Sequence, residues 1–173
     1  MSDIVFDHKA CGSCPIRHRA VCARCETDEL EELDSIKYYR SYEAGQPIVW
    51  SGDRMDFVAS VVTGVASLSQ AMEDGRTQMV GLLLPSDFLG RPGRDVAPYD
   101  VSAVSNLTLC CFRRKPFEAL MTRTPHIAQR LLEMTLDELD AARELGHEAP
   151  GLDDVRPVGL LEETDQRALL IYL

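Results

Sequence analysis

Four of the six cysteines lie close together near the start of the chain, in the segment CGSCPIRHRAVCARC. They form two Cys-x-x-Cys pairs that are separated by seven residues. The pairs are Cys11 with Cys14 and Cys22 with Cys25. Two further cysteines, Cys110 and Cys111, are adjacent and follow much later. Thiols at these spacings can hold a metal, form disulfides or carry out dithiol redox chemistry.

The surroundings of the cysteines favour metal binding. No run of eighteen apolar residues predicts a membrane span, and the first residues, MSDIVFDHKACG, do not resemble a secretion signal. We therefore expect a cytoplasmic chain, where thiols stay reduced and clustered cysteines more often bind metal than form disulfides. A dithiol oxidoreductase is disfavoured because the βαβ context of that class is missing.

Zinc is one metal that fits the pattern. The four N-terminal cysteines, Cys11, Cys14, Cys22 and Cys25, are enough for a structural four-cysteine site. His8 and His18 are possible substitute ligands. The spacer between the pairs is shorter than in most zinc ribbons, and this interpretation gives Cys110 no role.

Net charge and motifs exclude other functions. The chain carries 28 acidic and 18 basic residues, a net charge of −10, which argues against DNA binding by this chain alone. No catalytic constellation and no phosphate-binding glycine loop stand out, so we predict that the chain is not an enzyme. Arg91 and Arg94 are interpreted as surface charge.

Periodicity predicts a β-rich middle. Residues 1–27 are irregular, with little hydrophobic reason to fold without a metal. TDELEELDSI predicts a short helix with Thr27 as its cap. Residues 37–113 alternate between short strand-like runs and turns, and Asp74-Gly75 is a strong hairpin signal. The expected fold is an antiparallel sandwich or jelly roll.

The next segment predicts two helices. A short one begins around Pro116 and ends near Thr124-Pro125, and a long one ends at Gly146. Along the long helix, apolar and small residues recur in heptad spacing. They are Ala128, Leu132, Thr135, Leu139 and Ala142. We expect a homodimer through Ile127–Ala142; the alternative is a helix packed only on its own sheet.

Four segments follow from these patterns. They are a cysteine-rich loop (1–27), a β-roll (28–114), a helical segment (115–147) and an atypical tail (148–173). Pro150 and Gly151 interrupt the tail, which is acidic.

The glycines of the β-rich segment resemble those of the Crp/Fnr family of bacterial transcription regulators. Gly45, Gly52, Gly64 and Gly75 stand where that family places glycines, and PSDFLG (85–90) is similar to its G-D-F-x-G turn, with Ser86 in place of the first glycine. The resemblance covers about residues 11–147. It implies a cyclic-nucleotide-binding-like β-roll followed by a dimerisation helix.

The cysteines resemble those of the Fnr-type oxygen sensors in this family. CGSCPIRHRAVC is similar to their C-x2-C-x7-C motif, and LTLCCFRRKPFEAL places Cys110 at their fourth cysteine. The resemblance therefore implies a [4Fe–4S] cluster, whose ligand chemistry is thiolate. The implied ligands are Cys11, Cys14, Cys22 and Cys110. Cys25 is an alternative to Cys22.

Two further expectations concern the surroundings of this site. Cys110 and Cys111 should point to opposite faces of a regular strand, which leaves Cys111 as a partly buried hydrophobic residue. The basic stretch Arg17, His18 and Arg19 either offsets the cluster's negative charge or is solvated.

The family's other features are missing. Its nucleotide-binding members carry a glutamate after the G-D-F-x-G turn and an Arg-Ser pair beyond it. This chain has Arg91 and the stretch APYDVSA there, so cyclic nucleotide binding is not expected. No helix-turn-helix is recognisable after the long helix, as in a truncated, frameshifted or natural single-domain product. DNA binding is then expected only if a helix-turn-helix domain is supplied. A heterodimer with a full-length relative would interfere with that relative.

Overall fold

The structure is a computed structural model and describes residues 10–72 and 74–147. The helices are the short 3-10 helix η1 (Cys11–Ser13), α1 (Thr27–Ile36), α2 (Arg114–Arg123) and α3 (Pro125–His147). The strands are β1 (Lys37–Tyr42), β2 (Pro47–Val49), β3 (Phe57–Thr63), β4 (Ala66–Ala71), β5 (Thr77–Leu83), β6 (Phe88–Leu89), β7 (Asp100–Ala103) and β8 (Leu107–Arg113).

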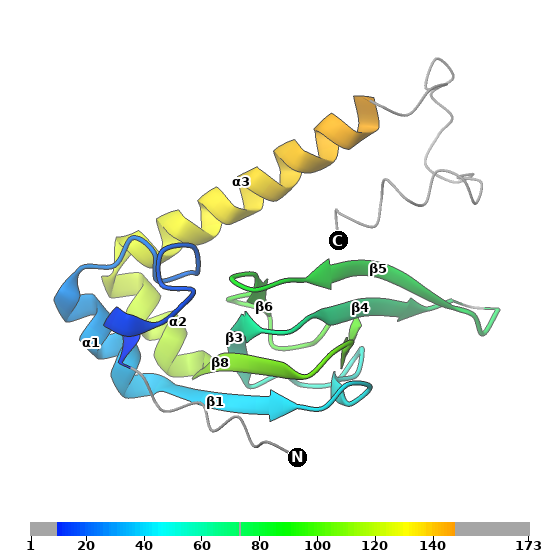
Figure 1. Cartoon of the computed structure of the whole chain (residues 1–173), viewed down its shortest axis with the longest axis horizontal. Coiled ribbons are helices and arrows are strands. Elements are labelled where there is room, and N and C mark those ends of the chain that lie inside the picture. Colours follow the sequence, from blue (N-terminus) through cyan, green and yellow to red (C-terminus); the bar gives the residue numbers. More distant parts are fainter. Residues whose placement is uncertain (1–9, 73, 148–173) are drawn as a thin grey trace.

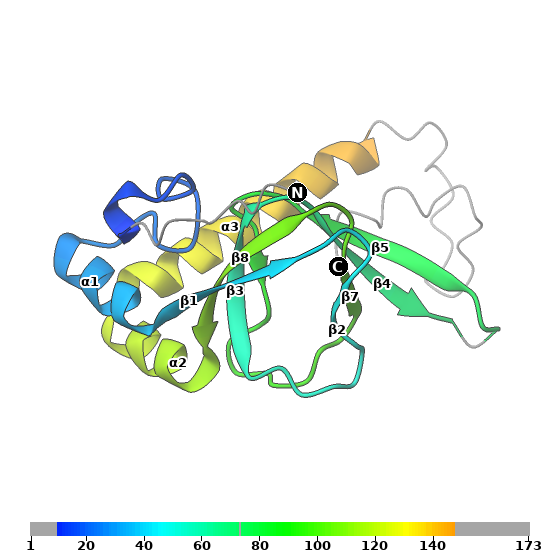
Figure 2. The ribbon, with the colours of Figure 1, turned by 60° about the horizontal axis from the view of Figure 1, so that its bottom comes forward.

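The strands form two four-stranded antiparallel sheets, in the orders β1-β8-β3-β6 and β2-β7-β4-β5. Figure 2 shows the first sheet beside the helices and the second on the far side of the roll. The expected hairpin at Asp74-Gly75 joins β4 to β5. The predicted β-roll followed by a long helix is therefore confirmed.

The central strands β3 and β8 are buried on both faces. Because side chains alternate along a strand, each of these strands contributes to two separate cores. Phe57, Ala59 and Val61 of β3 pack between the sheets. Val58 and Val62 pack on the outer face, against the helices and the cysteine loop. This outer core, between the sheet and the helices, contains five of the six cysteines.

Two turns show why the glycine pattern is informative. Gly64 has φ +85°, and a Cβ there would lie 2.2 Å from the carbonyl oxygen of Asn106, so no other residue fits. Ser86 also has positive φ, 89°, although it is not a glycine. Its backbone N–H donates to Val61 (2.8 Å), which joins the turn to β3. The chain therefore holds a non-glycine residue in a conformation that favours glycine.

The helices gather at one end of the roll (Figure 1). The predicted cap of α1 was wrong by one residue. Glu26 is the N-cap, and it forms a capping box with Glu29, whose side chain accepts from the Glu26 N–H at 2.7 Å. The short helix α2 ends at Arg123, where Thr124-Pro125 was expected to stop it.

Helix α3 starts against the core and then leads away from it (Figure 1). Ile127 is fully buried and Leu131 packs against the same core. Leu132 and Leu136, by contrast, are 59% and 48% exposed. The expected heptad residues Ala128, Leu132 and Thr135 all lie on the exposed surface. The helix thus packs on its own domain at one end and presents an apolar stripe along its length.

The helix runs one residue past the expected end at Gly146. The tail at 148–173 and its missing helix-turn-helix lie outside the described residues. Within those residues, none of the helices is both long and apolar enough to cross a membrane.

Candidate functional site: a buried group of cysteines

Five of the six cysteines meet at one core. Cys11, Cys22, Cys25 and Cys110 are buried in it, and Cys14 packs against it partly exposed. Three helices, the cysteine loop and the outer face of β3 and β8 build this core. Thiols that are far apart in the sequence therefore share one environment.

The cysteine loop folds through short-range turns and its own apolar residues. The N–H of Cys14 donates to the Cys11 carbonyl at 3.3 Å, and that of Cys25 donates to the Cys22 carbonyl at 3.1 Å. Ile16, Ala20 and Val21 are buried. The expectation of little hydrophobic reason to fold was wrong, because these three side chains pack on Leu33 and its neighbours in the core.

Strand β8 separates the two adjacent cysteines, as alternation predicted. Cys110 pairs with Tyr39 of β1 and with Ser60 of β3, and its side chain faces the N-terminal cysteines. Cys111 points into the core between the sheets and is fully buried there. Its thiol donates to the Leu109 carbonyl at 3.9 Å. Only one of the two residues is therefore available to the cysteine loop.

Burial keeps these thiols protonated in the metal-free chain. It raises the pKa of Cys11 and of Cys25 to about 12. The pKa of Cys110 is raised above its ordinary value by burial and then by the nearby thiols of Cys11, Cys14 and Cys22. Since metals bind the thiolate, occupation of the site must displace protons.

Two cations offset this cost. Lys37, at the start of β1, places its Nζ 3.7 Å from the Sγ of Cys11 and 2.6 Å from Oδ1 of Asp34. The same Asp34 oxygen accepts the N–H of Cys11 at 2.9 Å. Arg17 donates to the Cys25 carbonyl at 2.8 Å and lowers the pKa of Cys22 against the effect of burial.

Only one of these two cations was anticipated from the sequence. Arg17 belongs to the basic stretch that was expected either to offset negative charge or to be solvated. Its two neighbours do not approach the thiols in the same way: His18 is exposed, and the Arg19 carbonyl accepts from Arg130 at 2.7 Å. Lys37 was missed. Its i,i+3 pairing with Asp34 can be read from the sequence, but its approach to Cys11 depends on where the loop packs.

The hydroxyl of Ser60 is a further indication that this site holds a ligand. It lies directly across from Cys110 on β3, is buried, and its hydroxyl has no hydrogen-bond partner among the described residues. A buried hydroxyl without a partner is costly, so such atoms often await a ligand. Soft thiol donors, nearby cations and this free hydroxyl together fit an anionic metal–sulfur group. Over the described residues, no three His, Cys, Asp or Glu side chains converge on a point that would hold a single metal ion.

Comparisons with known proteins agree on the family. A family profile described as cyclic nucleotide-binding domain matches residues 39–124. The transcriptional activator protein FnrL of Cereibacter sphaeroides is 74% identical over 134 residues, which cover 78% of this chain and 54% of that protein. The nitrogen fixation regulation protein FixK of Bradyrhizobium diazoefficiens is 31% identical over 134 residues, 78% of this chain and 56% of that protein.

A solved structure supports the fold. The catabolite activator protein of Thermus thermophilus superposes with a TM-score of 0.61 at 24% identity, over 73% of this chain and 62% of that chain. The present chain spans about half the length of the curated relatives it matches. Fold, glycine pattern and relatives agree, and the chain belongs to the Crp/Fnr family.

Proposed function

We propose that this chain is the sensory and dimerisation part of a cytoplasmic transcriptional regulator, and that it holds an oxygen-labile [4Fe–4S] cluster through Cys11, Cys14, Cys22 and Cys110. Such a cluster, when bound, supplies redox chemistry that responds to oxygen. The chain itself supplies the four thiolates, a buried setting and the cations that balance their charge. It acts as a non-enzymatic regulator, and DNA binding requires a helix-turn-helix domain.

The observation that carries this proposal is the orientation of Cys110. Its side chain leaves β8 toward the loop cysteines, in the core that also contains Cys11 and Cys22. An all-loop zinc site would not need it. The thiols of Cys11, Cys14 and Cys22 each raise the pKa of Cys110, which indicates that these three lie within electrostatic reach of it.

The test is a matched pair of substitutions at adjacent positions. Cys110→Ser and Cys111→Ser remove one buried thiol each, from opposite faces of one strand. The proteins are purified without oxygen and assayed for iron, acid-labile sulfide, zinc and visible absorption. We expect about four irons and four sulfides per chain in the parent and in Cys111→Ser. Cys110→Ser should lose them while keeping the β-rich circular dichroism spectrum.

The zinc alternative gives a different pattern. A site made from Cys11, Cys14, Cys22 and Cys25 would yield a colourless protein with one zinc, unaffected by Cys110→Ser. That result would reject the cluster and leave the family assignment in place.

The choice between Cys22 and Cys25 needs a second pair. Both thiols are buried, but the Cys22 thiol is among those that raise the pKa of Cys110, and the Cys25 carbonyl is bound by Arg17. We assign Cys22 as ligand and Cys25 as a packing residue. Cys22→Ser should therefore abolish the cluster, and Cys25→Ser should retain it.

Dimerisation through α3 belongs to the same proposal. Exposed Leu132 and Leu136 supply the apolar stripe, in a chain that is otherwise strongly charged. A second copy of this chain is one occupant, and a full-length relative is another. We also propose that the roll does not bind a cyclic nucleotide, because the acid and arginine that would hold its ribose and phosphate are replaced by other residues.

A further inference from the structure

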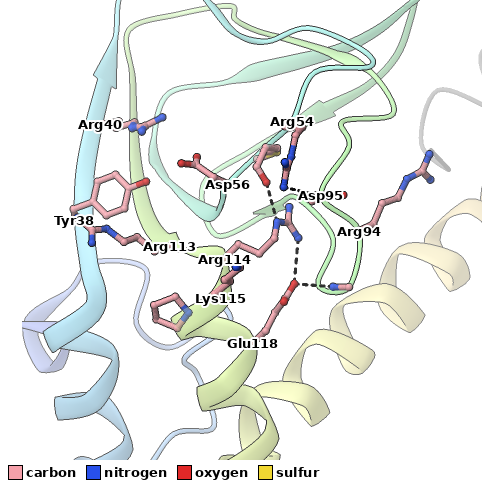
Figure 3. A pocket seen from close by; sticks show the side chains of 13 residues that line it. Tyr38, Arg40, Arg54, Asp56, Arg94, Asp95, Arg113, Arg114, Lys115 and Glu118 are labelled. Atoms are coloured by element: carbon pink, nitrogen blue, oxygen red, sulfur yellow. Dashed lines mark hydrogen bonds and ion pairs between the residues drawn. The ribbon is translucent and has the colours of Figure 1, made fainter.

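A cavity of about 860 Å³ opens at the end of the roll beside the start of α2 (Figure 3). Strand β1, the segment before β3, the 93–95 turn and the first turn of α2 form its walls. The residues that line it are Tyr38, Arg40, Arg54, Met55, Asp56, Gly93, Arg94, Asp95, Arg113, Arg114, Lys115, Pro116 and Glu118. Its size suits a small molecule, since ligand pockets usually measure some hundreds of cubic ångströms. None of the cysteines lines it.

The charge of this cavity opposes that of the whole chain. Six arginine or lysine residues and three acids line it, although the chain carries a net charge of −10. Two acids are already engaged, Asp95 by Arg54 at 3.1 Å and Glu118 by Arg114 at 3.4 Å. Over residues 10–72 and 74–147, no ion pair involves Arg40, Arg113 or Lys115. The positive charges of Arg40, Arg113 and Lys115 are therefore not balanced by acidic side chains of the described residues.

Arg40 is oriented by aromatic rings rather than by an acid. Its guanidinium lies 4.6 Å from the ring centre of Phe57 and 5.3 Å from that of Tyr38. Stacking of this kind fixes the guanidinium plane, and the N–H groups that are not bonded to the Tyr42 side chain remain able to donate. Figure 3 shows Arg40, Tyr38 and Arg113 together on the β1 side of the cavity.

The first turn of α2 breaks the usual charge rule for helices. No side chain caps it, no acid lies in the first turn, and Arg113, Arg114 and Lys115 stand there instead. Cations at a helix N-terminus are unfavourable because the helix dipole is positive at that end. A local rule broken in this way, inside a cavity, is expected where a function requires it.

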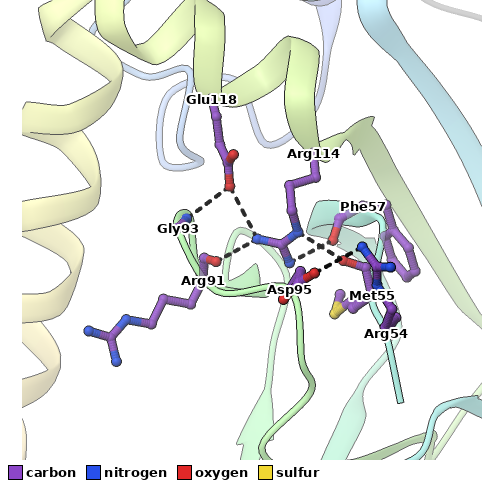
Figure 4. A network of polar contacts seen from close by, with 8 residues as sticks. All are labelled: Arg54, Met55, Phe57, Arg91, Gly93, Asp95, Arg114 and Glu118. Carbon is purple, nitrogen blue, oxygen red and sulfur yellow. Dashed lines mark hydrogen bonds and ion pairs between the residues drawn. The ribbon is translucent and has the colours of Figure 1, made fainter. Parts of the chain in front are cut away.

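The floor of the cavity is rigid. The Arg114 side chain is only 8% exposed, and it donates to the carbonyls of Met55 (2.8 Å) and Arg91 (2.6 Å) (Figure 4). Glu118 accepts from the Gly93 N–H at 2.8 Å and so anchors the adjoining turn. These bonds join the segment before β3, the 91–93 turn and α2. The backbone segments that carry the cationic side chains are therefore held in a fixed arrangement by these hydrogen bonds.

We propose that this cavity binds a small anion that carries two or more phosphate groups, held by Arg40, Arg113 and Lys115. A concave and preorganised cationic site suits a compact polyphosphate better than an acidic protein segment, which binds across flatter surfaces. The proposal does not rest on the cysteine site, and it holds whether or not that site contains a metal.

The experiment is isothermal titration calorimetry of the full chain with inorganic pyrophosphate at low ionic strength. The double variant Arg40→Gln/Arg113→Gln removes two wall cations. Arg76→Gln is the single-charge control, on the exposed β4–β5 hairpin; Arg76→Gln/Arg123→Gln matches the change of two charges. We expect the double wall variant to weaken binding by roughly tenfold per residue removed. Both controls should bind as the parent does.

Three outcomes would overturn the proposal. The first is no pyrophosphate binding by the parent chain. The second is an equal loss in the wall and control double variants, which would mean that only diffuse charge is sensed. The third is binding of a hexaglutamate peptide but not of pyrophosphate, which would assign the surface to an acidic protein segment. Each titration is repeated on metal-loaded and metal-free chain, so that failure of the cluster proposal is scored separately.

Discussion

Lys37 Nζ lies 3.7 Å from Cys11 Sγ, although the two residues come from different segments and are 26 positions apart. The Lys37 side chain is only 8% exposed. Burial by itself would lower the pKa of Lys37, but the hydrogen bond to Asp34 and the charge of Cys11 raise it above its ordinary value. Lys37 is therefore positively charged near neutral pH, and its charge stabilises the thiolate form of Cys11.

The first prediction concerns this lysine. Lys37→Met keeps the length of the side chain and removes its charge, so the thiolate form of Cys11 loses a charge-assisted donor worth about 1.5 kcal/mol. Hydrogen bonds to cluster sulfurs set reduction potentials, and this loss corresponds to a lowering of about 60 mV for a one-electron couple. Anaerobic potentiometry of the loaded protein measures it. Lys37→Arg should restore most of the shift; equal potentials in Lys37→Met and parent would contradict the assigned role.

The second prediction concerns the free hydroxyl beside Cys110. In the metal-free chain, Ser60→Ala removes a buried group that has no partner, so the free energy of unfolding should rise by about 1 kcal/mol. In the loaded chain the same change removes a potential donor to the site, so the gain should shrink or reverse. Urea unfolding of both forms measures this. Ser67→Ala, on β4 of the other sheet, is the control; the same gain in loaded and metal-free Ser60→Ala would count against a ligand at this position.

The third prediction concerns the strained turn. Ser86→Gly relieves a positive φ that costs a non-glycine residue about 1–2 kcal/mol, partly balanced by the greater backbone entropy of glycine in the unfolded chain. We expect the free energy of unfolding to increase by about 1 kcal/mol. Ser86→Ala keeps the strain and should show no such gain. Thermal and urea unfolding measure both variants, and a stability ranking with alanine above glycine would refute the strain.

The fourth prediction concerns the stripe on α3. Leu132→Glu places a charge in the exposed stripe and should convert a dimer to monomer, by at least a tenfold rise in dissociation constant for about 1.4 kcal/mol lost. Ala141→Glu adds the same charge about half a turn round the helix from Leu132 and should leave the dimer intact. Sedimentation equilibrium measures both. A monomeric parent, or equal dissociation of the two variants, would reject dimerisation through this face.

The fifth prediction concerns pH and the carboxyl groups of Asp87, in the β5–β6 turn, and Glu138, on α3. Burial raises the pKa of Asp87, and the Leu84 N–H and Arg19 oppose this only in part. Burial and then the charge of Asp87 raise the pKa of Glu138 on α3. A carboxyl group with a raised pKa contributes stability below its unfolded pKa, and this contribution is lost as pH rises through the folded value.

The contribution of these two carboxyl groups to the free energy of unfolding should therefore fall as pH rises above about 4, the unfolded pKa of such groups. Glu138→Gln removes part of this slope and should raise stability at pH 7 by less than about 1 kcal/mol, because the residue is only partly buried and solvent screens its charge. Asp137→Asn, one residue away, is the control. If the two variants show the same pH profile, Asp87 and Glu138 do not interact.

Local sequence patterns predicted most of the fold. Alternation, turn residues such as Asp74-Gly75 and the glycines with positive φ act over a few residues, so they can be read without knowing the tertiary structure. The helix cap was misplaced to Thr27 because a glutamate capping box was not considered. The buried Ile16, Ala20 and Val21 were overlooked because their partners lie elsewhere in the chain.

The sequence by itself determined that two adjacent cysteines must face opposite sides of a strand, and that glycines such as Gly64 mark tight turns. Only the tertiary structure decided that Lys37 reaches Cys11, that Ile16, Ala20 and Val21 pack in the core, and that Arg40 and Arg113 share a cavity. The physical reason is the sequence separation over which each interaction acts. Alternation and φ preferences belong to neighbouring residues, whereas the packing of a loop on a sheet depends on side chains that the chain brings together only on folding.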